Sequence, residues 1–370
     1  MPTLFTEFLS FPLLKEILLV TNVVLFVVIV SLFATLVVHK LAVEHWAQRL
    51  NELKERYLTD LSRACYDADL PVKRPNSRLE FEACGGAVTE LLVIVDGDMA
   101  TRMRSLALHL GIDHHYKKQL RSRSWVKRFA ALERLGFLRC AELKPLFVDA
   151  ITGENDLRIV AKALWALSLI ATAKDLPLLN HRLQNALFMS GKFNQHLYAN
   201  VIRAFRERGE EDAFLRLLGE LIHDPALPVL LKRDILQACG EEQLLGAQET
   251  ILDAYQRFAD VPEMRIACIR ALERLAVPFL TGLIADCLKD PDWRLRAAAA
   301  KEAYFCANGI VEPVRGALYD ENYHVRINAA ESLIRLGEQG QQALVAETRS
   351  ADRFVRDVSQ YVLKRMIYAA

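Results

Sequence analysis

The chain has 370 residues, with 47 Lys and Arg against 46 Asp and Glu, so its formal charge at neutral pH is +1. Binding to nucleic acid depends mainly on neutralising phosphates, and this balance supplies no excess of positive charge, so we expect no nucleic acid partner. Hydrophobic residues make up 52% of the chain, above the usual range of about 45–50%. Gly and Pro are few, at 16 and 12 residues, which is typical of a mostly helical chain.

Residues 17–38 form an uncharged, largely apolar stretch. About 20 apolar residues are enough to cross the hydrocarbon core of a bilayer, so this stretch predicts a transmembrane helix. A cleaved signal peptide fits less well, because residues 1–11 contain no Lys or Arg and no Ala-x-Ala site follows. The membrane is therefore an expected partner through residues 17–38.

Basic residues are distributed unequally on the two sides of this stretch. Lys15 alone precedes it, whereas four follow closely: Lys40, Arg49, Lys54 and Arg56. Because the flank that is richer in Lys and Arg stays on the cytoplasmic side of the membrane, the sequence predicts a single-pass protein of the inner (plasma) membrane. Residues 1–16 would be a short extracytoplasmic N-terminus, and the C-terminal domain would be cytoplasmic.

Residues 39–76 are predicted to form a juxtamembrane helix and a linker. An apolar stripe runs along the helical part at spacings of four, three, four and four residues: Trp46, Leu50, Leu53, Tyr57 and Leu61. This stripe fits two arrangements, packing on the protein's own next helices or pairing with a second copy in a homodimer. Pro71 and Pro75 end the helix, because proline lacks the donor N–H.

Residues 77–123 are predicted to form a helical N-terminal cap, in which the apolar run 79–95 is a buried helix. Asp96-Gly97-Asp98 reads as the following turn. It is not predicted to bind calcium, because the later ligand positions and the closing Glu of such a loop are missing.

The most basic segment follows, and it is the candidate binding patch. Its six cations are Lys117, Lys118, Arg121, Arg123, Lys127 and Arg128. Three interpretations stay open: contact with anionic lipid, binding of an acidic partner, or a solvated surface. His109, His114 and His115 lie nearby, but they would bind a metal only with a further ligand from elsewhere, so no metal site is predicted.

A repeated pattern occupies the rest of the chain, and residues 320–337 show it in full. Asp320 and Asn322 can cap a helix, an apolar stripe follows, and Gly337 can end it. The pair Val325-Arg326 has a counterpart at the same interval on each side and further matches upstream: Leu295-Arg296, Val355-Arg356, Met264-Arg265, Leu157-Arg158 and Val126-Lys127, with weaker candidates at Leu197 and Val229. A period of about 20–50 residues predicts a solenoid.

This pattern resembles the short bacterial form of the HEAT repeat over residues 124–370. The resemblance implies an all-α fold in which each repeat is two antiparallel helices and an Asp–Arg ladder joins successive repeats. The residues that match this structural ladder are Arg158, Arg265, Asp290, Arg296, Asp320, Arg326, Asp352 and Arg356. Lys127 and Tyr198 stand where the ladder would have Arg, so the sequence departs from the pattern there.

No motif for catalysis or for a cofactor is present: the chain has no Gly-rich phosphate loop, no G-x-S-x-G, no H-E-x-x-H and no zinc-type cysteine spacing. Seven scattered cysteines are expected to be reduced core residues. The sequence thus predicts a non-enzymatic, membrane-anchored scaffold for a protein partner at the cytoplasmic face. By analogy it would serve an envelope or polysaccharide synthesis complex. The alternative is a HEAT-repeat enzyme resembling the bilin lyases.

Overall fold

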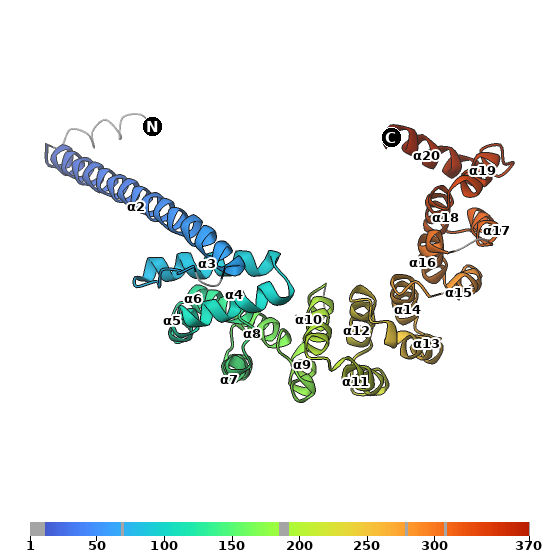
Figure 1. Ribbon diagram of the computed structural model, residues 1–370. Helices are drawn as coiled ribbons and strands as arrows, with labels where there is room; N and C mark the ends of the chain where they lie inside the picture. Colours follow the sequence, from blue (N-terminus) through green and yellow to red (C-terminus); the bar gives the residue numbers. More distant parts are fainter. Residues whose placement is uncertain (1–11, 68–69, 185–191, 278–279, 307–308, 370) are drawn as a thin grey trace. The chain divides into compact units, whose positions relative to one another are not determined.

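The structure is a computed structural model that describes residues 12–67, 70–184, 192–277, 280–306 and 309–369 (Figure 1). All regular elements within these ranges are helices, which agrees with the predicted all-α class. Residues 1–11, most of the predicted extracytoplasmic segment, lie outside the described residues. The chain divides into two compact units, Met1–Leu138 (unit 1) and Arg139–Ala370 (unit 2).

Unit 1 contains the longest helix, α2 (Pro12–Tyr66), which has 55 residues. At 1.5 Å per residue it is about 80 Å long. The apolar stretch 17–38 and the juxtamembrane stripe therefore belong to one uninterrupted helix. The large apolar side chains of residues 17–38 are all exposed, whereas Tyr57, Leu61 and Cys65 near the other end of α2 are buried.

Four shorter helices complete unit 1: α3 (Arg78–Ile94), α4 (Gly97–His109), α5 (Ile112–Gln119) and α6 (Trp125–Phe137). The buried end of α2 packs mainly on α3 and also on α4, and α3 in turn contacts α5 and α6. The C-terminal half of the apolar stripe thus packs on the protein's own helices. Trp46, at the other end of the stripe, remains 52% exposed.

Unit 2 is a row of helical hairpins. The first helices of the hairpins are α7 (Lys144–Gly153), α9 (Leu176–Leu183), α11 (Glu211–His223), α13 (Gln248–Arg257), α15 (Leu280–Cys287), α17 (Val311–Gly316) and α19 (Glu338–Glu347). The second helices are α8 (Leu157–Ser168), α10 (Phe193–Glu207), α12 (Val229–Glu241), α14 (Pro262–Arg274), α16 (Trp293–Glu302), α18 (Tyr323–Arg335) and α20 (Arg353–Ala369). Each second helix contacts the next, and Figure 1 shows these helices on the inner side of the curve that unit 2 follows.

The close approach of two second helices depends on a glycine. Gly240, near the end of α12, lies against Ala271 of α14, and a Cβ atom at Gly240 would come within 2.7 Å of the Ala271 Cα. Real Cβ atoms do not approach so closely, so any larger residue would push the two helices apart. This contact helps to make the inner layer of unit 2 continuous.

The repeated apolar position forms the core of the C-terminal hairpins. Met264, Leu295, Val325 and Val355 are each 0% exposed, close to the start of α14, α16, α18 and α20. Asn322 caps α18 by accepting a hydrogen bond from the His324 N–H at 2.9 Å. One period of the sequence pattern therefore corresponds to one helical hairpin.

At two places the register differs from the sequence-based alignment. Leu157 and Val229 are the first residues of α8 and α12 and are 39% and 37% exposed. The buried positions lie two residues later, at Ile159 and Leu231. The sequence alignment was based on a Leu-Arg pair at Leu157 and on an apolar run at Val229. The side chain that faces the core is instead set by its distance from the residue that caps the helix.

The boundary of the repeats also differs from the predicted residue 124. Helix α6, which contains Val126 and Lys127, belongs to unit 1 because its contacts are with α3 and α5. Both side chains are exposed, whereas the apolar residues Met264, Leu295, Val325 and Val355 of the C-terminal pairs are buried. All seven cysteines are free, as predicted, and six of them are buried; Cys140 is the partly exposed one.

Candidate functional site

The predicted Asp–Arg ladder pairs side chains between hairpins at two places. Arg265 pairs with Asp290, and Arg296 binds both oxygens of Asp320, with Nε to Oδ2 at 2.6 Å and Nη2 to Oδ1 at 3.0 Å. Arg296 also donates to the Asp290 carbonyl at 2.9 Å. These contacts join the ends of successive hairpins and have a structural role.

The other ladder residues make local contacts. Arg326 and Arg356 donate to backbone carbonyls of the turn before their own helix, those of Asp320 and Ser350, at 2.7 and 2.9 Å. Asp352 accepts from the Phe354 N–H and so caps α20. Arg158 binds Asp156, the capping residue of its own helix. Arg158 is the second residue of α8, as Arg294 is of α16, whereas the ladder residue Arg296 is the fourth residue of α16. The assignment of Arg158 to the ladder is therefore corrected.

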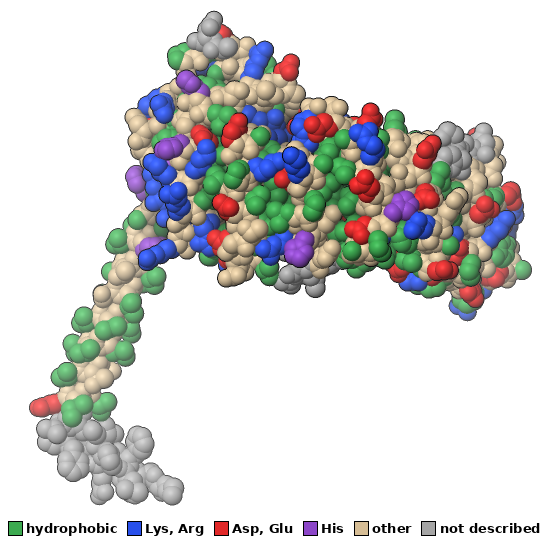
Figure 2. Space-filling view, turned by 90° about the horizontal axis from the view of Figure 1, so that it is seen from below, with side chains coloured by type: hydrophobic (Ala, Val, Ile, Leu, Met, Phe, Trp, Pro, Cys, Tyr) green, Lys and Arg blue, Asp and Glu red, His purple; other side chains and the backbone are tan. Residues whose placement is uncertain are grey.

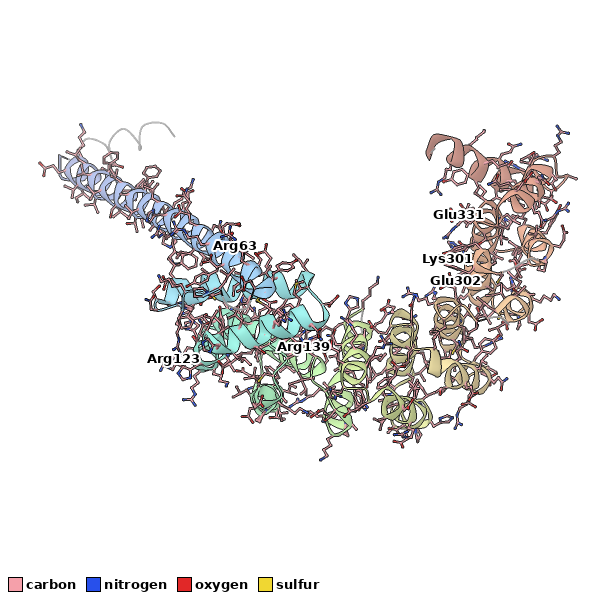
Figure 3. All side chains as sticks on the ribbon, in the orientation of Figure 1. Arg63, Arg123, Arg139, Lys301, Glu302 and Glu331 are labelled. Atoms are coloured by element: carbon pink, nitrogen blue, oxygen red, sulfur yellow. The ribbon has the colours of Figure 1, made fainter. Side chains whose placement is uncertain are left out.

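The inner side of unit 2 carries a groove between its second helices. One cavity has a volume of about 550 Å³ and is lined by Lys192, Gln195, Gln237, Glu241, Arg270, Ala271, Glu273, Arg274, Lys301, Glu302, Tyr304 and Phe305. A second cavity of about 350 Å³ adjoins it at Glu241 and extends to Trp165 of α8. Figure 3 shows Lys301, Glu302 and Glu331 on the inner side of α16 and α18.

Ion pairs between neighbouring second helices line this groove. They are Arg203–Glu242 at 3.2 Å, Glu241–Arg274 at 3.2 Å and Arg270–Glu302 at 3.7 Å. A further pair, Glu331–Arg365 at 3.1 Å, joins α18 and α20 outside the residues that line the two cavities. They fix several arginines in place while leaving part of each guanidinium open to a ligand, since each has five N–H donors. Sequence reasoning missed these pairs, because their spacing has meaning only once the stacking of the helices is known.

Carboxylates and aromatic rings complete the groove. Burial raises the pKa of Glu273, and the neighbouring charge of Glu302 adds to this shift. Phe305 is 50% exposed beside these groups, and the Arg335 guanidinium lies 3.0 Å from the centre of the Tyr304 ring. The groove therefore offers charged, hydrogen-bonding and apolar contacts within a few helical turns, as a protein-binding surface does.

The six residues of the predicted binding patch all belong to unit 1, but they differ in their contacts and in their exposure. Lys117 pairs with Asp113 at 2.8 Å, and Arg128 donates to the carbonyls of Ser122 and Arg123 at 2.9 and 3.2 Å. The remaining four have exposed side chains: Lys118, Arg121, Arg123 and Lys127. Figure 2 shows Lys and Arg side chains gathered on the part of the body from which α2 departs.

The nearby histidines differ from one another in their surroundings. His115 stacks on Phe81, with ring centres 4.5 Å apart, and burial lowers its pKa. His114 is exposed. Within the described ranges no group of three or more His, Cys, Asp or Glu side chains is arranged to hold a metal ion.

Comparison with known proteins bears on the class of fold. Residues 280–364 match the family of HEAT repeats. Similar solved structures include human deoxyhypusine hydroxylase in complex with glycerol, at 14% identity over 85% of this chain and 97% of that chain, with a TM-score of 0.25. An engineered protein is 13% identical over 85% and 93% of the two chains, with a TM-score of 0.35.

Importin beta is 13% identical over 86% of this chain, with a TM-score of 0.41, and the match spans about half of that protein, 52%. No curated protein sequence matches the chain. The matched repeats and the stacked hairpins of unit 2 together define an α-solenoid with HEAT-type repeats.

Proposed function

We propose that the protein is a membrane-anchored scaffold whose solenoid binds a protein partner at the cytoplasmic face of the inner membrane. The observation that carries the anchor is the exposed apolar part of α2. Among the described residues α2 is the one helix long and apolar enough to cross a membrane, with a mean hydropathy of 2.9 and no burial over its most apolar window. In water this surface would stay uncovered, whereas a bilayer would cover it.

Two polar side chains in this part of α2 are compatible with a bilayer. The hydroxyls of Thr21 and Thr35 donate to the carbonyls of Ile17 and Ser31, four residues earlier, at 2.7 and 2.8 Å. A hydroxyl that is satisfied within its own helix adds little to the cost of entering hydrocarbon.

The groove of unit 2 supports the scaffold role. Neighbouring packed helices lie about 8–10 Å apart, so the second helices from α8 to α16 span roughly 32–40 Å. That length fits an extended partner segment of about 10–12 residues. Confinement beside the bilayer would raise the effective concentration of a partner that is itself bound to the membrane. By analogy with anchored HEAT-repeat proteins, we propose an envelope assembly, such as a polysaccharide synthase, as the partner complex.

The orientation of the anchor gives a first prediction. Because basic residues follow the apolar stretch, a reporter that is active only in the periplasm is expected to be silent when fused after Ala370. A reporter active only in the cytoplasm, fused at the same place, is the control and should be active. Strong periplasmic activity would reverse the assigned orientation.

The groove gives a second prediction. Phe305→Ala should reduce capture of the partner from detergent-solubilised membranes at least about tenfold, because exposed aromatic anchors contribute strongly to protein interfaces. Phe354→Ala removes an aromatic ring of similar exposure, 64%, at the start of α20 and outside the groove, and it should capture as the parent does. Equal capture by both variants would exclude the groove as the binding surface.

A further inference from the structure

The four exposed cations Lys118, Arg121, Arg123 and Lys127, here called the basic patch, lie at a definite place in unit 1. The end of α5 is held on α3, because Gln119 Nε2 donates to Glu82 Oε1 at 2.7 Å and His115 stacks on Phe81. The chain continues from α5 through the patch into α6, which also contacts α3. The patch therefore lies beside the N-terminal half of α3.

The contacts between α3 and α2 fix the direction in which α3 runs. Lys54 pairs with Glu90, near the C-terminal end of α3, and lies next to Gly86 in the middle of α3. Further along α2, burial raises the pKa of Tyr57, with contributions from Cys84 and Glu80 of α3. The two helices are thus antiparallel, and the N-terminal half of α3 points away from residues 17–38.

This arrangement sets the distance of the basic patch from the bilayer. The part of α2 between Val38 and Tyr57 is about 28 Å long at 1.5 Å per residue. The headgroup layer adds only about 5–8 Å outside the hydrocarbon core. Surface charges act over about 8 Å more at physiological ionic strength. A typical helix tilt of about 20° shortens the distance along α2 only slightly, so the patch stays outside the reach of lipid charges.

The patch is also an ordered surface. Two hydrogen bonds from Arg128 to carbonyls hold the loop between α5 and α6, and the Lys117–Asp113 pair lies within α5. No Asp or Glu occurs from His114 to Arg128. The four exposed cations are therefore presented from a defined backbone, with no acidic residue of their own segment among them.

We infer that the basic patch docks an acidic segment of a protein partner and does not contact lipid. The choice of a protein over lipid headgroups rests on the proposed anchoring of α2, since the depth is measured from residue 38. Unit 1 has 18 Lys and Arg against 15 Asp and Glu, whereas unit 2 has 29 against 31. The excess of positive charge thus lies in the unit that carries the patch, which favours an acidic occupant.

The test uses the full chain in nanodiscs of neutral phosphatidylcholine and in nanodiscs that also contain phosphatidylglycerol. The probe is a fluorescein-labelled peptide of alternating Glu and Ala, followed by fluorescence anisotropy. The parent should bind it in both nanodiscs, and added salt should weaken the binding. Replacing all four residues of the patch by Gln should weaken the binding about tenfold or more. Each exposed ion pair contributes only modestly to the affinity, but four pairs are lost together.

A matched variant controls for loss of charge alone. It replaces four exposed cations of unit 2 by Gln: Arg216, Arg257, Lys289 and Arg349. This variant should bind the peptide as the parent does, and an equal loss of binding in the two variants would overturn the inference. So would binding by the parent in neutral nanodiscs that disappears in anionic ones, because lipid headgroups would then occupy the patch.

Failure of the anchor would be recognised separately. A chain that stays outside the nanodiscs contradicts the proposed function and removes the reason for excluding lipid. The same peptide titration in detergent still compares the parent with the two variants. If the parent in detergent bound the peptide no better than the variant that lacks the four patch cations, the inference that the patch binds acidic segments would be overturned.

Discussion

Replacing Val325 by Asp is expected to lower the free energy of unfolding by about 3–5 kcal/mol, because it buries an unpaired carboxylate. Val325 is 0% exposed at the start of α18, and its counterparts in the neighbouring hairpins are equally buried. In a solenoid each hairpin is stabilised by its neighbours, so the loss should be largest around α16, α18 and α20. Thermal unfolding followed by circular dichroism would measure it.

Val345→Asp is the matched control for this change. Val345 lies in the next helix, α19, and is 54% exposed, so the same substitution should change stability by no more than about 0.5 kcal/mol. If Val325→Asp melted at the temperature of the parent, Val325 would have to face solvent and the register of the repeats would be wrong.

The second large effect is expected at the contact between Arg296 and Asp320. Both side chains are largely buried, 11% and 10% exposed, and two hydrogen bonds join them. Arg296→Gln would leave the Asp320 carboxylate without its cation and should cost about 3 kcal/mol. Arg294→Gln, two residues away, removes ion pairs at the surface and should cost less than about 1 kcal/mol. Urea unfolding at neutral pH would compare the two, and equal costs would contradict the structural role of the ladder.

The same contact predicts a dependence on pH. Burial alone would raise the pKa of Asp320, but the hydrogen bonds from Arg296 and from the Asn322 N–H outweigh burial and lower it. A lowered pKa in the folded state stabilises the protein above the unfolded value of about 3.9, and this stabilisation is lost as the pH falls through the folded value. The difference in stability between the parent and Arg296→Gln should therefore shrink in acid; a constant difference would exclude this mechanism.

The fold was predictable where local signals agree. Asn322, the stripe through Val325 and Leu333, and the constant interval between the repeats together predicted the hairpins of unit 2. At Leu157 and Val229 the signals conflicted, because the matched residue is the first of its helix there, whereas it is the third residue of α14, α16, α18 and α20. The place of α6 in unit 1 depends on its tertiary contacts with α3 and α5, which no local pattern reveals.

The candidate surfaces were predictable only in part. The sequence showed six cations in residues 117–128. It did not show that Lys117 pairs with Asp113 and that Arg128 donates to two carbonyls, which leaves the other four side chains exposed. The groove of unit 2 could not be found from the sequence, because Glu242 and Arg203 become neighbours only through the stacking of α10 and α12. Pairing of this kind is a property of the assembled layer.

The unbroken course of α2 limits how the length of its exposed part can change. In the proposed anchored protein, each residue added between Val38 and Trp46 would turn everything beyond it by about 100° about the helix axis and move it about 1.5 Å from the bilayer. Insertions of about seven or eleven residues nearly restore the original direction about the helix axis, because they come close to a whole number of turns. The direction in which the basic patch of unit 1 faces about the α2 axis thus depends on the number of residues in this segment and not on their identity.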